Sequence, residues 1–594
     1  MTEIQNRFRA DPEQMGDLMK VALGQMEADM AVINGDIVNV YTGEILAGNT
    51  VLVKGDRIAY VGKNGAKSVG SSTEVIDAAG KTVIPGLIDG HTHIDNPYTP
   101  EELVRYAMKG GVTTVFTEVD EIAFTLGYRG IIQFLKAVEN QPIKIFITVP
   151  PMVTISRAAE EQAITVKELS KLLKRKGVIG LGEPYWSQVI TGNRRVLDLI
   201  AETINSGKTV EGHSAGARDN KLQAYFALGI SSCHEPITAE EARERLRLGL
   251  FIPIREGEIR RDLEAISKLK DENIDMGKLV LSTDGIGPEQ LVADGYLEFV
   301  VQKAIDLGFD PVTAIKMVTL HPAQRFGLDN IIGGIAPGKL ADIVIIPEVS
   351  TIRPECVISN GKLIFRDGAF LVEPEKYAYP AWTEKSVRLT RDVTDKDFTV
   401  PVDKARHRAG VRVMDLVTPL VTREAVIDFP VNNGELSIDV SNDLLKIAAI
   451  ERTHIPGKTF TCFVRGFRLK SGAIATTSVW DLTDIIVIGA SEADMALAVN
   501  RVRQLKGGTV VCSGNRVLAE MALPIGGVVS REPMEILARQ LADIQQAAAG
   551  LGFPHPDLRT TMSVMATSAI PFLRICEDGL YSIDQDCLVD LIVD

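Results

Sequence analysis

Two histidines separated by a single residue are the first side chains in the sequence whose spacing suggests chemistry. His91 and His93 form a His-Thr-His motif that follows the apolar segment "VIPGLID" after one intervening glycine. On a β-strand, residues i and i+2 point to the same face, so both imidazoles could bind one metal ion. The apolar run ends at this motif, as it would at the carboxyl end of a buried strand, where the active sites of (β/α)8 barrels lie. The motif alone leaves open two histidines with ordinary hydrogen-bonding or surface roles.

Four later residues end apolar runs in the same way. They are Glu183 after "VIGLG", His213 after "KTVEG", His234 after "GISSC" and Asp284 after "KLVLST". Four imidazoles and two carboxylates could hold two divalent ions with a bridging hydroxide, and we expect Glu183 to bridge them because a carboxylate offers two oxygens. A bound metal lowers the pKa of its water towards about 7. Asp284 could take the proton of that water and pass it to the leaving group. The sequence therefore predicts a metal-dependent hydrolase.

The elements that would position these residues follow from the hydrophobic pattern. Between residues 84 and 335, apolar runs such as "TTVFTEV" and "IKIFITVP" alternate with amphipathic stretches such as "TPEELVRYAMKGG". Buried strands alternating with helices indicate either a parallel barrel or a doubly wound sheet. The placement of the candidate ligands at strand ends favours an α/β fold of the (β/α)8 TIM barrel type over 84–335.

The remaining segments predict three further parts. Residues 1–30 are expected to form an N-terminal helical arm. The segments 31–83 and 336–375 both contain short strands of alternating hydrophobicity separated by turns. Each segment alone is too short to bury a core, so we expect the two to form one small composite β-sandwich domain. The segment 380–594 contains apolar strands such as "DIIVIG" and the amphipathic helix "PMEILARQLADIQQAAAG", which predict a C-terminal α/β domain.

Composition narrows the functional class. A chain of 594 residues is too long for one hydrophobic core. The formal net charge of -14 argues against a nucleic-acid partner. No uncharged apolar run is long enough for a membrane span, and no signal-peptide pattern precedes the first strand. The six cysteines include no CxxC pair, so neither a disulfide framework nor a thiolate zinc site is expected. A reduced, soluble, cytoplasmic protein is the expectation.

The order of motifs is similar to that of the amidohydrolase superfamily. A β-meander precedes "PGLIDGHTH", a glutamate, two separated histidines, a "TD" motif and "GGIAPGKLADIVII". More closely, the chain resembles the adenine deaminase family in "GLGEPYW", "EGHSAG", "LQAYFALGISSCHE", "LRLGLFIPIREG" and "LSTD". The resemblance continues into the C-terminal "DIIVIGASEADMALAVNRV" and "LPIGGVVS", so it covers nearly the whole chain.

This resemblance implies a reaction, a cofactor and a ligand set. The reaction is hydrolysis of adenine to hypoxanthine and ammonia, and the substrate is a small heterocyclic molecule. Two divalent ions of manganese, iron or zinc are implied, and a homodimer or larger homo-oligomer is expected. The implied ligands are His91, His93, Glu183, His213, His234 and Asp284.

Three segments depart from the pattern of the family around the predicted ligands. Relatives usually read "DPHE" where this chain reads "EVDE" (residues 118–121), and Gly285 replaces a second aspartate. In the C-terminal region, "SVWDLTD" (residues 478–484) replaces a histidine-rich segment. Loops around a barrel mouth determine the substrate, so we expect specificity to differ. Candidate catalytic residues are Asp284, Glu118, Glu121 and His234, and candidate substrate contacts are Asp120, Tyr185, Trp186 and Arg255.

Several alternatives stay open at this point. Tyr185 and Trp186 could stack on a flat substrate or pack in the core, and Arg255 could bind substrate or form a structural ion pair. Deamination of a purine-like base is the leading functional hypothesis. Hydrolysis of a cyclic or heteroaromatic amide by the same metal hydroxide is the second, and a metal-binding protein without catalytic activity is the third.

Overall fold

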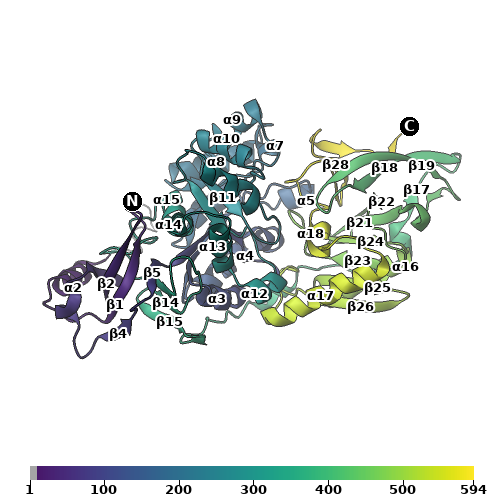
Figure 1. Cartoon of the computed structure of the whole chain (residues 1–594). Coiled ribbons are helices and arrows are strands. Elements are labelled where there is room, and N and C mark those ends of the chain that lie inside the picture. Colours follow the sequence, from purple (N-terminus) through teal and green to yellow (C-terminus); the bar gives the residue numbers. More distant parts are fainter. Residues whose placement is uncertain (1–9, 594) are drawn as a thin grey trace.

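The computed structural model describes residues 10–593 and divides them into three parts that follow one another along the molecule (Figure 1). A β-rich part built from both sides of the central region lies at one end, helices surround parallel strands in the middle, and a second β-rich part forms the other end. The predicted N-terminal arm is described from residue 10 only. It is one helix, α2 (Pro12–Ala22), which packs on two strands of the first β-rich part instead of extending away from it.

The first β-rich part is a single hydrogen-bonded sheet made from two segments of the chain. Its strand order is β16-β15-β14-β13-β5-β1-β2-β3, with β4 paired to β1. The N-terminal segment supplies β1 (Met30–Asn39), β2 (Glu44–Lys54), β3 (Arg57–Gly62), β4 (Glu74–Asp77) and β5 (Thr82–Pro85). The later segment supplies β13 (Ile343–Ile346), β14 (Cys356–Ser359), β15 (Lys362–Arg366) and β16 (Ala369–Phe370).

Antiparallel pairing of β5 with β13 joins these two segments. Val83 pairs with Ile345 and Ile84 with Val344, and the joined strands bury one shared apolar cluster that includes Val83 and Ile345. Hydrogen bonding therefore runs from one edge to the other within one sheet. The sheet also branches at β1, which pairs with β4 and with β5 along different parts of its length.

The central region contains a parallel sheet in the order β10-β9-β8-β7-β6 and a parallel pair, β11 and β12. Their bounds are β6 (Leu87–His93), β7 (Val112–Glu118), β8 (Lys144–Val149), β9 (Val178–Leu181), β10 (Thr209–Val210), β11 (Ile252–Arg255) and β12 (Leu279–Ser282). Nearly every residue of these strands is buried, which explains why their sequences are continuous apolar runs.

Helices alternate with these strands. They are α3 (Pro100–Lys109), α4 (Asp120–Val138), α5 (Arg157–Glu160), α6 (Val166–Leu173), α7 (Trp186–Val189), α8 (Arg194–Asn205), α9 (Asp219–Phe226), α10 (Ala239–Arg247), α11 (Leu263–Ile266), α12 (Pro288–Asp294), α13 (Leu297–Asp306), α14 (Pro311–Lys316) and α15 (Leu320–Arg325). The sequence sets several of their starts. Thr165 and Glu168 form a capping box at α6, and Pro311 begins α14 behind the capping residue Asp310.

The C-terminal part is a nine-stranded sheet in the order β19-β18-β22-β21-β24-β23-β25-β26, with β30 paired to β18. Its strands are β18 (Arg408–Leu416), β19 (Thr422–Pro430), β21 (Leu445–Glu451), β22 (Thr459–Arg465), β23 (Ala473–Thr476), β24 (Asp484–Gly489), β25 (Gly508–Ser513), β26 (Arg516–Ala522) and β30 (Ile592–Val593). Smaller pairings involve β17 (Val400–Pro401), β20 (Glu435–Leu436), β27 (Leu573–Cys576), β28 (Gly579–Ser582) and β29 (Cys587–Val589).

Helices and strands are thus mixed in this part as expected, but in a different topology from a parallel α/β domain. Apart from β18 with β22, the pairs of the nine-stranded sheet are antiparallel. Most strands follow one another through turns and not through crossover helices. The helices are α16 (Glu492–Gln504), α17 (Met534–Leu551) and α18 (Leu558–Ser563).

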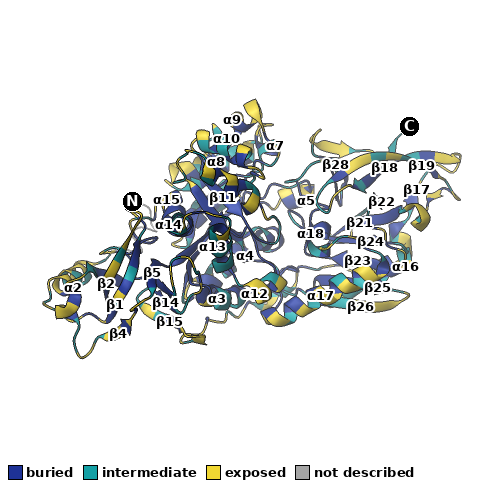
Figure 2. Ribbon diagram, viewed as in Figure 1, coloured by how far each residue is buried: buried dark blue, intermediate teal, exposed yellow. Residues whose placement is uncertain are grey.

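One apolar cluster extends from the central region into the C-terminal part. It includes Leu291 of α12 and Leu541 of α17, and these two helices pack on each other. Figure 2 shows the buried strands of both parts in dark blue, with exposed residues on the outer helix faces. Among residues 10–593, every helix is too short or too polar to cross a membrane.

Candidate metal centre

The six predicted ligands lie at or just beyond the carboxyl ends of the central strands. His91 and His93 end β6, Glu183 follows β9 by two residues, and His213 follows β10 by three. His234 and Asp284 lie at the equivalent places, after the segment that bridges to Phe251 and after β12. Parallel strands end at a common edge, so residues far apart in the sequence converge there.

Four of the six side chains form a tight, buried group: His91, Glu183, His234 and Asp284 each offer one ligand atom, and these atoms lie within 4.8 Å of one another. His91 Nε2 is 2.8 Å from Glu183 Oε1 and 3.2 Å from Asp284 Oδ1. His93 lies at the border of this group, with its Nε2 3.5 Å from Asp284 Oδ1 and 4.0 Å from Glu183 Oε1. The two imidazoles of the His-Thr-His motif therefore reach the same carboxylates.

A second group shares His234 and contains a residue that the sequence did not indicate. His213, His234 and Glu235 also offer ligand atoms within 4.8 Å of one another. Glu235 Oε1 is 2.9 Å from His234 Nε2 and 3.3 Å from His213 Nδ1. Glu183 connects the two groups, because its Oε1 faces His91 while its Oε2 is 3.0 Å from His213 Nδ1. Strand alternation would have placed Glu235 on the opposite face from His234, so the pattern gave no reason to select it.

Charge in this cluster is balanced between imidazoles and carboxylates. Burial favours the neutral form of Glu183, yet the positive charges on His234 and His91 outweigh burial and hold the pKa of this carboxyl well below its usual value. Burial opposes ionisation of Asp284 as well, and His234 and His91 again keep its pKa well below normal. Both carboxylates are thus stable as anions only beside positive charge.

The residues present fit a divalent metal site. His91 Nε2 and Glu183 Oε1 face each other without hydrogen-bond geometry, and both are buried atoms that lack a hydrogen-bond partner among the described residues. The same holds for His213 Nε2. Buried polar atoms without partners are costly, and a cation would satisfy them while supplying the positive charge that the carboxylates require. Imidazole nitrogens with carboxylate oxygens suit manganese, iron or zinc.

A buried ion pair lies behind His91. Glu211 Oε2 is 2.9 Å from His91 Nδ1, and Glu211 Oε1 is 2.5 Å from Arg325 Nη2. Arg325 also donates to the carbonyl of Gly90 and to the hydroxyl of Ser232. A carboxylate at Nδ1 fixes the ring so that Nε2 points into the cluster. The sequence signal for Glu211 was its position two residues before His213, but nothing local indicated its partner in α15.

The acidic residues of the "EVDE" segment take three different positions. Glu118 accepts hydrogen bonds from the backbone N–H of Glu183 at 2.9 and 3.1 Å and lies behind that residue, outside the cavity lining. A Cβ at Gly182 would lie 1.5 Å from the Glu118 carboxylate oxygen, so any larger residue there would displace this side chain. Asp120 Oδ2 is 3.4 Å from His93 Nδ1. Asp120 and Glu121 both line the cavity in front of the cluster.

Burial determines the protonation of these carboxyls. Loss of water around Glu118, with the negative charge of Asp120, raises its pKa well above normal. Burial and the charge of Asp95 act in the same direction on Glu121. A neutral carboxylic acid can donate a hydrogen bond as well as accept one. Glu121 can therefore either donate a hydrogen bond to a molecule in the cavity or accept one from it.

The cavity at the metal centre has a volume of about 360 Å³ and is lined by residues of two parts of the chain. Of the candidate substrate contacts, Tyr185 and Arg255 line it, whereas Trp186 does not line it and donates its ring N–H to the carbonyl of Ala215. Arg255 is held by Asp262 at 3.0 Å and Glu235 at 3.0 Å, and lies 3.6 Å from Asp284 Oδ2. It is therefore both an ion-pair partner and a wall of the cavity.

The C-terminal part closes one side of this cavity. Lining residues from it include Trp480, Asp481 and Arg559. Asp481 accepts a hydrogen bond from the Tyr185 hydroxyl at 2.9 Å and others from Thr567 and the N–H of Ser568. Arg559 pairs with Glu258 of the central region. The departure "SVWDLTD" thus lies at the cavity itself.

Comparison with known proteins agrees with this site. Residues 82–364 match the model of the amidohydrolase family, and residues 419–587 match that of the adenine deaminase C-terminal domain. The chain is 36% identical to an adenine deaminase of Moorella thermoacetica over 97% of its own length and 98% of the relative. It is 32% identical to an adenine deaminase of Clostridium botulinum over 99% and 100% of the two lengths. A solved molinate hydrolase is distantly similar, with 19% identity, a TM-score of 0.45 and coverage of 57% of this chain and 95% of that one.

Two relatives above 30% identity align with this chain end to end, and the matched segments contain the buried cluster of histidines and carboxylates as well as the cavity wall from the C-terminal part. The chain belongs to the adenine deaminase family, within the amidohydrolases.

Proposed function

We propose that this protein hydrolyses adenine to hypoxanthine and ammonia at the cluster of His91, Glu183, His234 and Asp284. One observation carries the proposal: partnerless buried nitrogen and oxygen atoms converge at the floor of a cavity of about 360 Å³. Such a cavity accommodates a small flat molecule. The names of the end-to-end relatives supply the choice of adenine among such molecules.

The proposed reaction assigns a role to each predicted residue. The oxygen of water adds to the ring carbon that bears the amino group, and the bond from that carbon to nitrogen breaks. Asp284 takes one proton from the attacking water and delivers it to the departing nitrogen, which leaves as ammonia, while the second proton of water stays with the hypoxanthine product. His91, His93, Glu183, His213, His234 and Asp284 would hold the metal, which would supply an activated water at neutral pH.

The remaining candidates hold the ring and the ligands. Glu121 and Asp120 face the cavity and hydrogen-bond the ring nitrogens, and Tyr185 with Arg255 limits where the ring can lie. Glu118 keeps the backbone of Glu183 in place, so that its contribution to catalysis is one of positioning. His234, which belongs to both ligand groups, orients the reacting water. Trp186 supports the wall through Ala215 and stays a weaker candidate for a substrate contact.

We propose further that the central strands close into a (β/α)8 barrel flanked by the composite β domain and the C-terminal domain. Three hydrogen bonds support closure: Ser231 N to Val210 O, Cys233 N to Phe251 O and Asp284 N to His91 O. The two ligand groups, which share His234, would hold two divalent ions, and Glu183 directs one oxygen toward His91 and the other toward His213. The free cysteines of the described chain suit a reducing, cytoplasmic setting, and assembly as a homo-oligomer is testable by light scattering.

Steady-state kinetics test the reaction. Protein loaded with manganese is mixed with adenine, and hypoxanthine and ammonia are measured together. We expect equal amounts of both products. A kcat/KM of about 10⁵ M⁻¹s⁻¹ or above, the range of ordinary enzymes, would show that the three changed segments leave specificity for adenine intact, and a lower value would show that they alter it. Cyclic amides are offered in parallel, because they need the same metal chemistry and a different pocket. Turnover of an amide with none of adenine would reject the deaminase proposal and keep the metal centre.

A further inference from the structure

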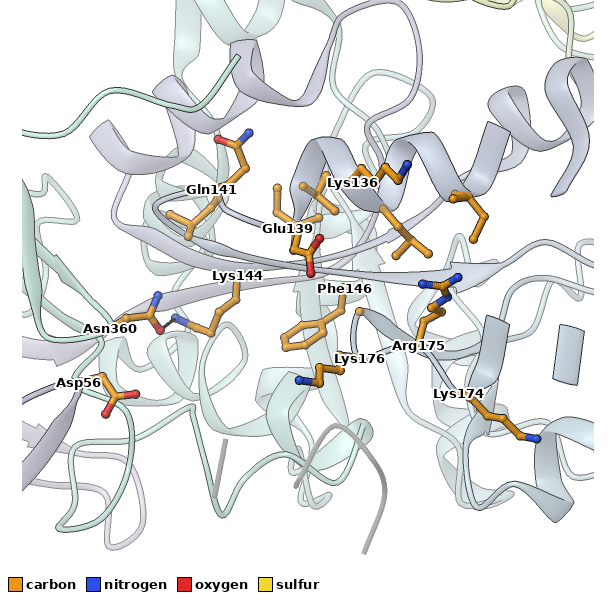
Figure 3. Close-up of a pocket in the computed structure, with 16 residues that line it drawn as sticks. Asp56, Lys136, Glu139, Gln141, Lys144, Phe146, Lys174, Arg175, Lys176 and Asn360 are labelled. Carbon is orange, nitrogen blue, oxygen red and sulfur yellow. Dashed lines mark hydrogen bonds between the residues drawn. The ribbon is translucent and has the colours of Figure 1, made fainter. Parts of the chain in front are cut away.

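A second cavity opens at the opposite end of the central strands from the metal centre. Its volume is about 560 Å³, and it lies where β8 and β9 begin, whereas the metal ligands follow the ends of their strands. Figure 3 shows α4 above it, the segment 174–177 on one side and Asn360 with Asp56 on the other. Asp56 and Asn360 belong to the composite sheet region, so the cavity lies at a junction between parts of the chain, a common place for ligand sites.

The lining of this cavity is basic, although the chain as a whole carries a net charge of -14. It contains five basic residues, Lys136, Lys144, Lys174, Arg175 and Lys176, and two acidic ones, Asp56 and Glu139. Lys144 is already neutralised, because its Nζ lies 2.7 Å from Asp342 Oδ1. The other four basic side chains form no ion pair with any described residue.

The basic groups are arranged around an apolar floor. In Figure 3, Arg175 lies to the right of the Phe146 ring, Lys176 lies below it, Lys136 lies above it on α4, and Lys174 points away. Ile132 and Leu135 of α4 add an apolar wall. Glu139 directs its carboxylate toward the same centre. Basic side chains also stabilise the ends of helices, but that role does not require Lys136, Arg175 and Lys176 to line the same cavity.

We propose that this cavity binds an organic phosphate, a phosphate ester with a small apolar body, between Lys136, Arg175 and Lys176. A phosphate dianion matches several unpaired cations better than a single carboxylate does. Ile132 and Leu135 would contact the apolar body of the ligand. The site is separate from the metal centre and does not depend on the proposed deaminase reaction.

Calorimetric titration of the full chain with phenyl phosphate tests the proposal, because this probe carries the phosphate and an apolar ring without being a purine. We expect saturable binding of one equivalent, weaker binding of inorganic phosphate, and a loss of affinity of about tenfold or more between about 0.05 M and about 0.5 M salt. Absence of saturation at about 5 mM probe, where a Kd near 1 mM is still detected, would overturn the proposal. Equal affinity for inorganic phosphate would show that the apolar ring does not contribute to binding and would overturn that part of the proposal.

Variants on the cavity rim locate the binding. Replacing Arg175→Ala together with Lys176→Ala should weaken phenyl phosphate by about tenfold or more, since each lost cation removes a charge-assisted contact. Glu139→Gln should act in the opposite direction and strengthen binding several-fold, because it removes a like charge from the site. Lys171→Ala is the matched control: it is an exposed cation on α6, the helix that precedes Arg175 and Lys176, and does not line the cavity.

All of these side chains are exposed, so the variants should fold, which thermal unfolding verifies. Wild-type affinity in the double variant, or a Glu139→Gln variant that binds no tighter, would place any binding elsewhere and overturn the assignment. Since the readout is binding of a phosphate ester, failure here leaves the adenine reaction untouched, and failure of that reaction leaves this site untouched.

Discussion

Glu211 shows how one buried carboxylate can control a metal ligand that it does not replace. Its two oxygens contact His91 Nδ1 and Arg325, so the ring of His91 is held on the side away from the cluster. Burial would raise the pKa of Glu211, but Arg325 and His91 outweigh it and keep the pKa below normal. The group therefore stays ionised and accepts a hydrogen bond from the Nδ1–H of His91, which leaves Nε2 free for a metal.

We predict that Glu211→Gln weakens metal binding by about 10- to 100-fold, the usual range for such supporting carboxylates. The amide keeps the shape but can no longer balance Arg325, and it accepts more weakly from His91. Competition with a chelator of known affinity measures this directly. Glu264→Gln, an exposed position, serves as the control. Unchanged metal affinity in the Glu211 variant would show that His91 is positioned by the backbone alone.

Asp284 is predicted to matter for proton transfer more than for folding. Asp284→Asn keeps the side-chain volume but removes the basic oxygen, and should lower kcat by about 10² to 10⁴, the contribution of a positioned acid–base group. Circular dichroism and thermal unfolding should stay near wild type. Turnover within twofold of wild type would exclude Asp284 as the proton carrier. Metal content is measured on the same sample, because a lost ion would lower kcat for a different reason.

At the scale of elements, α18 is attached to the central region by one ion pair. Arg559 of α18 contacts Glu258, and burial raises the pKa of Glu258 while Arg559 opposes this. Both side chains are mostly buried, so removing one leaves the other without a partner. In such pairs the isolated charge costs more than the pair contributes.

A double-mutant cycle tests this attachment. Arg559→Met should destabilise the protein by about 2–4 kcal/mol, and Arg559→Met combined with Glu258→Gln should recover at least about half of that loss. Chemical denaturation measures the free energy of unfolding for wild type, both single variants and the double variant. Simple addition of the two single effects would mean that the ion pair does not couple these elements.

Glu298, in the first turn of α13, makes the stability of the central region depend on pH. Burial raises the pKa of Glu298 from 4.5 to about 7, so the folded state favours the protonated form. Its contribution to stability is complete below the unfolded pKa and is lost as pH rises toward 7. Glu298→Gln imitates the protonated form at every pH.

We therefore expect the melting temperature of Glu298→Gln to exceed that of wild type by more at pH 8 than at pH 5. A difference on the order of 1–2 kcal/mol follows once residual solvent contact is allowed for. Scanning calorimetry at both pH values provides the comparison, and Glu264→Gln supplies a control without burial. A constant difference across pH would show that Glu298 ionises normally in the folded protein.

At the scale of the whole molecule, the hydrophobic pattern of the sequence selected the six candidate ligands but not the residues that surround them. His91, His93, Glu183, His213, His234 and Asp284 each end an apolar run, and the structure brings all six to one sheet edge. The same rule could not reveal Glu235, which follows His234 at a point where the chain has left regular alternation. Periodicity predicts a side chain's direction only while the strand continues.

Contacts between distant segments explain most of what the sequence missed. Glu211 pairs with Arg325, and Glu258 with Arg559, across separations that leave no periodic signal. For Trp186, which could stack on a substrate or pack in the core, the structure shows that its ring N–H donates to the carbonyl of Ala215. The C-terminal part has apolar strands, as predicted, but their antiparallel order depends on turns and pairings that apolar content does not encode.

Because α12 and α17 share an apolar cluster, we predict that the central region is not stable without the C-terminal part. A chain ending at residue 375 would expose the side of Leu291 and its neighbours that α17 covers. Exposed apolar patches of this kind promote association. We expect such a fragment to aggregate or to bind a hydrophobic dye strongly, as measured by sedimentation and fluorescence. A monodisperse fragment that unfolds with wild-type cooperativity would show that the central region is independent.

The pairing of β5 with β13 also sets an order of events during synthesis on the ribosome. β5 ends at Pro85, but its antiparallel partner begins only at Ile343. At a translation speed of about 5–20 residues per second, the first strands wait on the order of tens of seconds for their neighbours. During that interval one edge of β5 is open to other chains. The nascent N-terminal strands are therefore the part of this protein most dependent on chaperones.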